Sequence, residues 1–208
     1  MPNFAAFSLF LTAAFILSIT PGPGMLYVLT RSLHGGRQEG LVSALGTFIG
    51  GFFHVLAAAI GLSAVLMASA VAFSVVKYAG AAYLIYLGMR MLLSRQELLH
   101  SINSRGSGNQ RALYQGIVTE ILNPKTGLFF LAFIPQFVDP SSNTLLQFLL
   151  LGLITVSFNF TVDVIVAAFA GPLGSYFQSH RRFRQRQRTF SGCSMIGLGA
   201  YVALAEQK

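Results

Sequence analysis

The chain has 208 residues, a formal net charge of +8, 54% hydrophobic residues and only 10% charged residues. A soluble domain usually carries about 25% charged residues because its surface faces water. This composition, with a mean hydropathy of +0.65, therefore excludes an ordinary soluble protein. No charged residue lies between Met1 and Thr30 or between Gly40 and Val76. Since about 20 apolar residues cross a bilayer as a helix, these stretches predict an integral membrane protein.

Six transmembrane helices are predicted along the chain. In order, their approximate ranges are 4–30, 41–66, 71–93, 113–138, 144–170 and 189–205. The sixth is short, and the sequence leaves open whether it spans the bilayer fully. The strands of a β-barrel would alternate apolar and polar residues over about 10 residues, whereas runs such as 145–154 do not alternate. The predicted fold class is therefore an all-α membrane protein.

Two of the predicted helices are interrupted. Two prolines and two glycines fall within residues 20–24 of the first helix, and Asn123-Pro124-Lys125 lies within the fourth. Proline removes a backbone donor and clashes with the preceding turn, and glycine weakens a helix further. A broken helix at membrane depth is tolerated in a protein interior or beside a wet cavity, where its ends suit carboxylate and ammonium groups. The breaks favour a substrate site over two purely structural kinks. The candidate substrate-binding residues are Pro21, Gly22, Pro23, Asn123, Pro124 and Lys125.

Charged residues inside the predicted helices are the next candidates, because a charge in the bilayer is costly unless it is paired or hydrated. They are Lys77, Glu120, Lys125 and Asp163. Glu120 shares a helix face with Asn123, and Asp163 shares one with Asn159, by their spacing of three and four residues. This arrangement predicts a polar path through the second half of the chain.

Asp163 is the first candidate for proton coupling and Glu120 is the second. A carboxylate buried in a low-dielectric environment can load and release a proton near neutral pH. No basic residue lies near Asp163 in its own helix, whereas Lys125 follows Glu120 closely and can pair with it. The alternative is a buried ion pair between Lys125 and one carboxylate, without a role in transport. Secondary candidates are Lys77, Asn159 and His54, which is either a packing residue or a proton relay.

The basic residues predict the orientation. Of the 14 Lys and Arg residues, 11 lie in or beside three loops on one side of a six-helix chain. The other three are Lys77, Lys125 and Lys208. The positive-inside rule makes that side cytoplasmic and puts both termini outside. The arginine run at 181–188 is interpreted as a topology signal that contacts anionic lipids, so no nucleic-acid partner is expected.

The predicted organisation is a single transmembrane domain. Residues 1–93 form one three-helix half, 94–112 a cytoplasmic linker, and 113–208 a second half. Because three spans is an odd number, the second half is inverted relative to the first, and inverted repeats with broken helices in matching positions are typical of transporters. Gly46 and Gly50 form a close-packing pair, either within the chain or in a homo-oligomer.

Motifs for other chemistry are missing from the sequence. There is no Gly-x-Ser-x-Gly, Walker or dinucleotide-binding motif, and no cluster has metal-ligand spacing. Cys193 is the single cysteine, so no disulfide forms within the chain, and it is expected to be a small packing residue. We therefore expect no enzyme activity, cofactor or metal.

Several runs of residues, taken in their order and spacing, resemble one known family. They are Pro21-Gly22-Pro23, then Gly35, Gly40 and Gly46, then His54, Gly61-Leu62, 77–88 (KYAGAAYLIYLG) and 123–138 (NPKTGLFFLAFIPQFV). Over nearly its whole length the chain resembles the LysE/RhtB family of bacterial amino-acid exporters. Gly24 stands where that family more often has a polar residue, and Glu120 where it more often has an uncharged one, so the substrate does not transfer.

The resemblance implies export of a small amino acid or derivative across the bacterial inner membrane, driven by the proton motive force. The breaks and the buried carboxylates lead to a secondary transporter that works by proton-coupled alternating access. The alternatives are a channel for a small metabolite or ion, and a membrane enzyme or redox conduit. The single cysteine and the missing nucleophile–base set argue against the last two.

Overall fold

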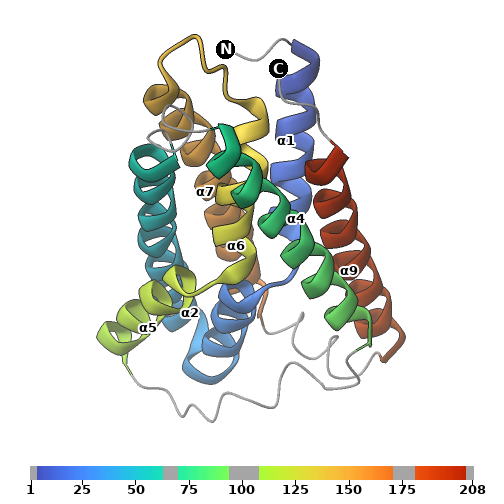
Figure 1. The fold of residues 1–208 in the computed structure, drawn as a ribbon. Coiled ribbons are helices and arrows are strands. Elements are labelled where there is room, and N and C mark those ends of the chain that lie inside the picture. The colour runs from blue at the N-terminus through green and yellow to red at the C-terminus, as the bar shows by residue number, and fades with distance from the viewer. Residues whose placement is uncertain (1–3, 63–69, 94–107, 171–180, 205–208) are drawn as a thin grey trace.

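The structure of the protein, a computed structural model, describes residues 4–62, 70–93, 108–170 and 181–204 (Figure 1). Every regular element in these ranges is a helix, which confirms the predicted all-α fold. In chain order the elements are α1 (Phe4–Ile19), α2 (Pro23–Ala57), η1 (Ala58–Leu62), α4 (Ala70–Leu93), α5 (Asn109–Ile121), α6 (Pro124–Leu128), η2 (Phe129–Phe133), η3 (Ile134–Phe137), α7 (Thr144–Ala168) and α9 (Arg181–Leu204).

The first predicted break separates α1 from α2. Helix α1 ends at Ile19, Gly22 is extended with φ −132° and ψ −177°, and Pro23 begins α2. Proline is well placed there, because the first residue of a helix has no partner for its N–H and φ is already near the helical value. The interruption predicted from the prolines and glycines is confirmed.

The second predicted break separates α5 from α6. Helix α5 ends at Ile121, and Asn123 is extended with φ −76° and ψ 105°. Pro124 then begins α6, and the Asn123 side chain accepts a hydrogen bond from the backbone N–H of Lys125 at 3.1 Å. Asparagine is a favoured N-cap because its side-chain oxygen satisfies one of the free amides of the first turn. The second interruption is therefore also confirmed.

The expected loop between the first two predicted helices is wrong. Residues 31–40 are helical apart from Gly36, whose φ of 80° and ψ of 176° divide α2 into two helices joined at a kink. A positive φ is the conformation that glycine adopts without steric cost. One glycine therefore makes the reversal for which the sequence analysis expected a loop.

The two halves run in opposite directions. In Figure 1, α1 starts at the end of the bundle that holds both termini, whereas α5 starts at the other end. The kink in α2, the end of α4, and the starts of α5 and α9 all lie at this second end, which we call the basic end because Arg31, Arg37, Arg90, Arg111 and Arg186 belong to these segments. Of the predicted linker, residues 94–107 lie outside the described residues.

Glycines bring helices of the two halves close together. A Cβ atom at Gly88 of α4 would lie 2.6 Å from the backbone O of Gly192 in α9, and one at Gly192 would lie 2.9 Å from the backbone O of Gly88. On α2, Gly46 and Gly50 face the backbone of α5. The predicted close-packing pair is therefore used inside the chain.

A first prediction concerns this contact between α2 and α5. A Cβ atom at Gly116 would lie 2.8 Å from the Ser43 backbone O and 3.1 Å from the Cα of Gly46. We expect Gly116→Ala to lower the free energy of unfolding by about 1 to 3 kcal/mol, because the two backbones must separate. The matched control is Gly197→Ala, whose Cβ atom would meet nothing within 4 Å. Equal melting temperatures of the two variants in detergent would contradict the close approach.

Among the residues that the structure describes, three helical runs are long and apolar enough to cross a membrane: Pro23–Gly61, Asn109–Phe137 and Thr144–Ala168. Phe4–Ile19 and Thr189–Leu204 are apolar but shorter. Large apolar side chains on the outside, such as Phe53, Leu56 and Ile165, match the hydrocarbon of a bilayer. The chain is therefore a multi-pass membrane protein.

Helix α9 corrects two details of the sequence analysis. It begins at Arg181, eight residues before the predicted start of the sixth helix at Thr189, so the whole arginine run at 181–188 is helical. Cys193, which was expected to be a small packing residue, is exposed instead. The face of α9 that packs on α4 is occupied by Gly192 and Gly199, where helices approach closely.

Candidate functional site

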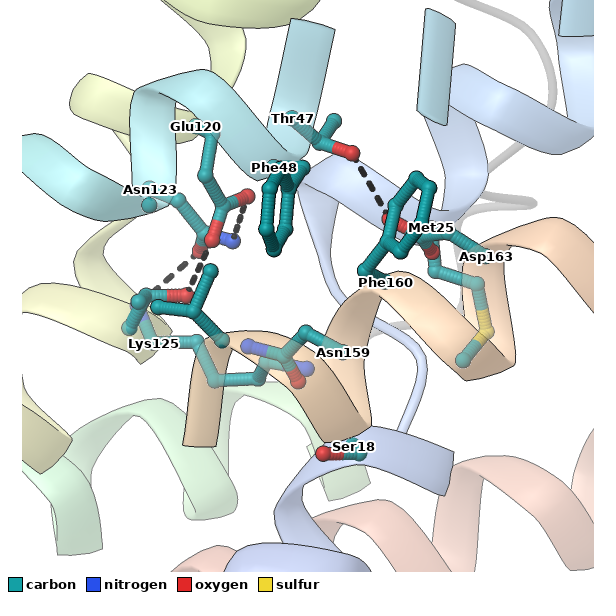
Figure 2. Close-up of a pocket in the computed structure, with 13 residues that line it drawn as sticks. Ser18, Met25, Thr47, Phe48, Glu120, Asn123, Lys125, Asn159, Phe160 and Asp163 are labelled. Atoms are coloured by element: carbon teal, nitrogen blue, oxygen red, sulfur yellow. Dashed lines mark hydrogen bonds between the residues drawn. The ribbon is translucent and has the colours of Figure 1, made fainter. Parts of the chain in front are cut away.

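A cavity lies where the two breaks meet (Figure 2). Its lining comes from the end of α1, from α2, from the α5–α6 break and from α7. The lining residues are Ser18, Met25, Thr47, Phe48, Gly51, Glu120, Asn123, Lys125, Thr126, Val156, Asn159, Phe160 and Asp163. The cavity volume that the centre of a water molecule can occupy is about 20 Å³, which is room for about one water. The cavity is therefore too small for an amino acid in this conformation.

Lys125 joins the two breaks directly. Its ammonium donates hydrogen bonds to the backbone oxygens of Thr20 at 2.7 Å and Leu17 at 3.0 Å, at the C-terminal end of α1. The last carbonyls of a helix have no partner within the helix and carry a partial negative charge, so a cation there is favourable. Gly22 leaves space for this side chain, because a Cβ atom at Gly22 would lie 3.0 Å from Lys125 Cε.

Glu120 is held by two neutral donors. Its carboxylate accepts a hydrogen bond from Asn123 Nδ2 at 3.0 Å and another from the Thr126 hydroxyl at 2.7 Å. The side chain is buried and comes from the last turn of α5, while both donors follow the break. Glu120 and Asn123 are therefore in direct contact, but the predicted shared helix face is wrong, because Asn123 is extended beyond the end of α5.

Asp163 lies on the other side of the cavity. It is buried on α7, and its Oδ2 accepts a hydrogen bond from the Thr47 hydroxyl of α2 at 2.8 Å. In Figure 2 the ring of Phe48, whose centroid is 4.6 Å from that of Phe160, lies between Asp163 and Glu120. The two carboxylates therefore face one cavity from different helices.

The alternative of a direct ion pair between Lys125 and a carboxylate is not what the structure contains. Within the described ranges, the ion pair found at 4.0 Å or less is that between Arg31 and Glu39. The ammonium of Lys125 instead donates to carbonyl oxygens, because the C-terminal end of α1 lies beside it.

The secondary candidates separate into two groups. Asn159 lines the cavity, as the polar-path prediction expected. His54 does not: its Nε2 lies 2.8 Å from the backbone O of Glu120, and its ring packs 5.9 Å from that of Phe130. Lys77 is buried on α4 away from the cavity lining, with its ammonium 5.2 Å from the centre of the Tyr78 ring.

The prolines and Gly22 shape the site without lining it. Pro21, Pro23 and Pro124 lie at the ends of the broken helices, outside the cavity lining. Their contribution is to end α1 and α5 at the depth where Lys125 and Glu120 meet their partners. Ser18, Thr47 and Thr126 also line the cavity and were not predicted, because a buried hydroxyl residue gives no signal in an apolar helix.

A second polar cluster, also missed, lies near the basic end. Arg31 forms a buried ion pair with Glu39 at 3.0 Å across the kink of α2. Its guanidinium also donates to the Tyr27 hydroxyl at 3.2 Å and to Gln115 Oε1 of α5. Tyr27 in turn donates to the backbone O of Ala112 at 2.8 Å. This cluster ties both parts of α2 to α5.

Metal binding has no support in the described part of the chain. No group of three or more His, Cys, Asp or Glu side chains there is arranged to hold a metal ion. The site is an assembly of two carboxylates, one ammonium, amides and hydroxyls, which suits a small polar organic molecule.

Comparisons with known proteins agree over almost the whole chain. A family model described as LysE type translocator matches residues 15–206. An uncharacterized membrane protein of Vibrio cholerae is 32% identical over 201 residues, covering 95% of this chain and 96% of the relative. The homoserine/homoserine lactone efflux protein of Salmonella typhimurium is 30% identical over 200 residues, covering 94% and 95%. The leucine efflux protein of Enterobacter sp. strain 638 is 31% identical over 199 residues, covering 93% of each. No solved structure gives a significant match.

Proposed function

This chain belongs to the family of LysE type translocators, and on that premise we propose that it exports a small amino acid or amino-acid derivative from the cytoplasm. The relatives with named activities are efflux proteins for homoserine, homoserine lactone and leucine. These compounds share a primary amine on a small skeleton. The buried cavity at the meeting point of the two breaks is the site that we assign to such a molecule.

The charge of the cavity supports exchange with protons. Its charged lining residues are two carboxylates, Glu120 and Asp163, and one ammonium, Lys125. The lining therefore has one more acidic group than basic groups. When both carboxylates are ionised, this excess negative charge is buried and requires a compensating cation. Either the ammonium of the substrate or a proton supplies it. If the two alternate, outward movement of substrate is coupled to inward movement of a proton.

Asp163 is the residue that we assign to the proton. It accepts one hydrogen bond, from Thr47, and Asn159 one turn away continues the polar lining. Glu120 has two donors that fix its carboxylate. Asp163 is thus the carboxylate with fewer partners and the one better able to change its protonation state.

The small volume of the cavity supports alternating access. The site holds about one water, and an amino acid is several times larger, so the surrounding helices must separate for substrate to enter. The Arg31 cluster joins α2 to α5 between the cavity and the basic end. We assign this cluster to the closed state of the cytoplasmic entrance, which opens when α5 moves away from α2.

The orientation follows from the basic end. By the positive-inside rule this end is cytoplasmic, and both termini are outside. A second prediction tests this. Reporter fusions after Arg105 and Arg184 should report cytoplasm, and a fusion at the C-terminus should report the outside. A cytoplasmic C-terminus would show that the sixth helix does not span or that the bundle is inverted.

Efflux assays test the proposed function itself. Cells that lack the protein, and cells that overproduce it, are loaded with labelled homoserine, leucine and a panel of other amino acids. Overproduction should lower the retained amount of at least one compound, and a cavity variant such as Lys125→Met should not. Equal retention of every compound in all strains would contradict the proposal.

A further inference from the structure

Both helix ends exposed by the first break are already faced by charges of the chain itself. The C-terminal end of α1 receives the ammonium of Lys125. The N-terminal end of α2 receives the carboxylate of Glu120, which lies against Gly24 in the first turn of α2. A helix N-terminus attracts an anion and a C-terminus a cation. A charge of the chain therefore already lies at each of the two ends, and we expect the side chains facing the cavity to recognise the substrate.

Gly24 leaves the space in which the Glu120 carboxylate lies. A Cβ atom at Gly24 would overlap Glu120 Oε2, and it would lie 3.6 Å from Asn123 Nδ2, which donates to that same oxygen. Gly24 has an ordinary helical conformation, since the positive-φ glycines in the described ranges are Gly36 and Gly108. Glycine is therefore required at this position by the space that the Glu120 carboxylate occupies, and not by the backbone conformation.

The carboxylate of Glu120 has neutral partners and room for another donor. Each of its oxygens accepts one hydrogen bond, from Thr126 or Asn123, and a carboxylate has about four acceptor positions. In the part of the chain that the structure describes, no Lys, Arg or His side chain lies within 4.0 Å of it. Glu120 also lines the cavity. It is therefore a fixed anionic acceptor that faces the space assigned to the substrate.

The cavity offers less to an anion. Its one ammonium, that of Lys125, already uses two of its three N–H groups on the carbonyls of α1. A substrate carboxylate would also meet the fields of Glu120 and Asp163. The site thus has two acceptors for a cation and at most one free charged donor for an anion.

We propose that Glu120 binds the ammonium group of the transported molecule, and that Gly24 is the positioning residue that gives this carboxylate its place. The cavity then selects for a free primary amine and not for a free carboxylate. Its ligand class includes carboxyl-blocked derivatives such as α-amino amides, esters and lactones. This inference rests on the proposed function and adds the chemical group by which the substrate is recognised.

The test compares three forms of one skeleton in proteoliposomes containing the purified protein. The probes are leucine, leucinamide and N-acetylleucine, together with the same three forms of homoserine, each as a competitor of labelled counterflow. For the wild type we expect the amide to compete as well as the amino acid or better. The N-acetyl form should compete about tenfold more weakly, since it lacks the ammonium that pairs with Glu120.

Variants then separate positioning from packing. Gly24→Ala should weaken competition by the two amines about tenfold and leave the N-acetyl form unchanged, because the new methyl group displaces the carboxylate. Adding Glu120→Asp, which shortens the side chain by one methylene, should restore part of the loss. Gly127→Ala is the control, since its Cβ atom would make an ordinary 3.4 Å contact with His54 Cε1.

The outcomes distinguish the two proposals. If the wild type transports the amines but accepts the N-acetyl forms equally well, the amine recognition is wrong while the exporter function stands. The same holds if Gly24→Ala weakens all three forms alike and Glu120→Asp restores nothing, because Gly24 is then only a packing residue. If the wild type transports neither these probes nor any compound of the amino-acid panel, the proposed function fails and this inference fails with it.

Discussion

Replacing Lys125 with methionine is expected to reduce efflux by about 100-fold, because two buried carbonyls lose their donor and the cavity loses its one ammonium. Methionine has a similar length and flexibility, so it fills the space beside Gly22. The freed carbonyls of Leu17 and Thr20 lie beside a cavity that admits a water molecule, which can replace the ammonium as a donor. Membrane abundance should therefore stay near that of the wild type. The measurement is efflux per molecule of protein, with abundance read from the same membranes.

Lys77→Met is the matched control. Lys77 is also a buried lysine, but it lies on α4 outside the cavity lining. We expect it to change efflux per molecule by about twofold or less, since it removes no contact of the site. A collapse in the abundance of Lys125→Met would show that Lys125 has a structural role. A large loss of efflux in Lys77→Met at normal abundance would instead extend the site to α4.

Asp163→Asn is expected to leave exchange of substrate intact and to abolish accumulation driven by a pH gradient. Asparagine has nearly the shape of aspartate, and its side-chain oxygen can still accept the hydrogen bond from Thr47. It cannot bind and release a proton. With one proton exchanged per substrate, one pH unit is about 1.4 kcal/mol and supports a substrate gradient of about tenfold. The wild type should approach that gradient, and the variant should stay near equal concentrations.

The control for this prediction is Glu120→Gln. Glu120 is also a buried carboxylate of the cavity, but its assigned partner is the substrate and not the proton. This variant should need more substrate for half-maximal rate and still reach a gradient. Counterflow and gradient-driven uptake are compared for both variants in the same proteoliposomes. Uphill uptake by Asp163→Asn at the level of the wild type would remove Asp163 as the coupling residue.

The features that the sequence could predict are those determined by neighbours along the chain. Proline and glycine act on their own turn, so the breaks predicted at 20–24 and at 123–125 lie next to the observed breaks at 20–22 and 122–123. The spacing of Glu120 and Asn123 gave a correct contact within one break. Membership of the LysE type translocators likewise confirms the prediction of a transporter and not an enzyme.

The features that the sequence could not predict are contacts between the halves. Nothing near Lys125 indicates that its ammonium binds carbonyls of α1, more than 100 residues earlier. Thr47 and Asp163 are likewise 116 residues apart. The contact of Gly24 with Glu120 was invisible for the same reason, although both were noted as departures from the family pattern. Such pairs become neighbours only when the inverted halves pack.

The kink at Gly36 shows a different limit. Several glycines in the first half are compatible with a turn, and the sequence does not show which of them adopts the positive φ. Arg31 was therefore interpreted as a loop residue and a topology signal, when it is buried with Glu39. A charge pair eight residues apart is uncommon in a straight helix, and here the kink brings the two side chains together.

Substrate-driven proton movement is the most direct test of the exchange that we propose. Purified protein is reconstituted into vesicles that contain a pH-sensitive dye, with equal pH on both sides, and homoserine or leucine is added outside. Entry of the substrate should expel protons, so the lumen should become more alkaline, while vesicles with Asp163→Asn or without protein should show no change. Transport of labelled substrate by the wild type without any change in lumenal pH would contradict proton exchange through this cavity.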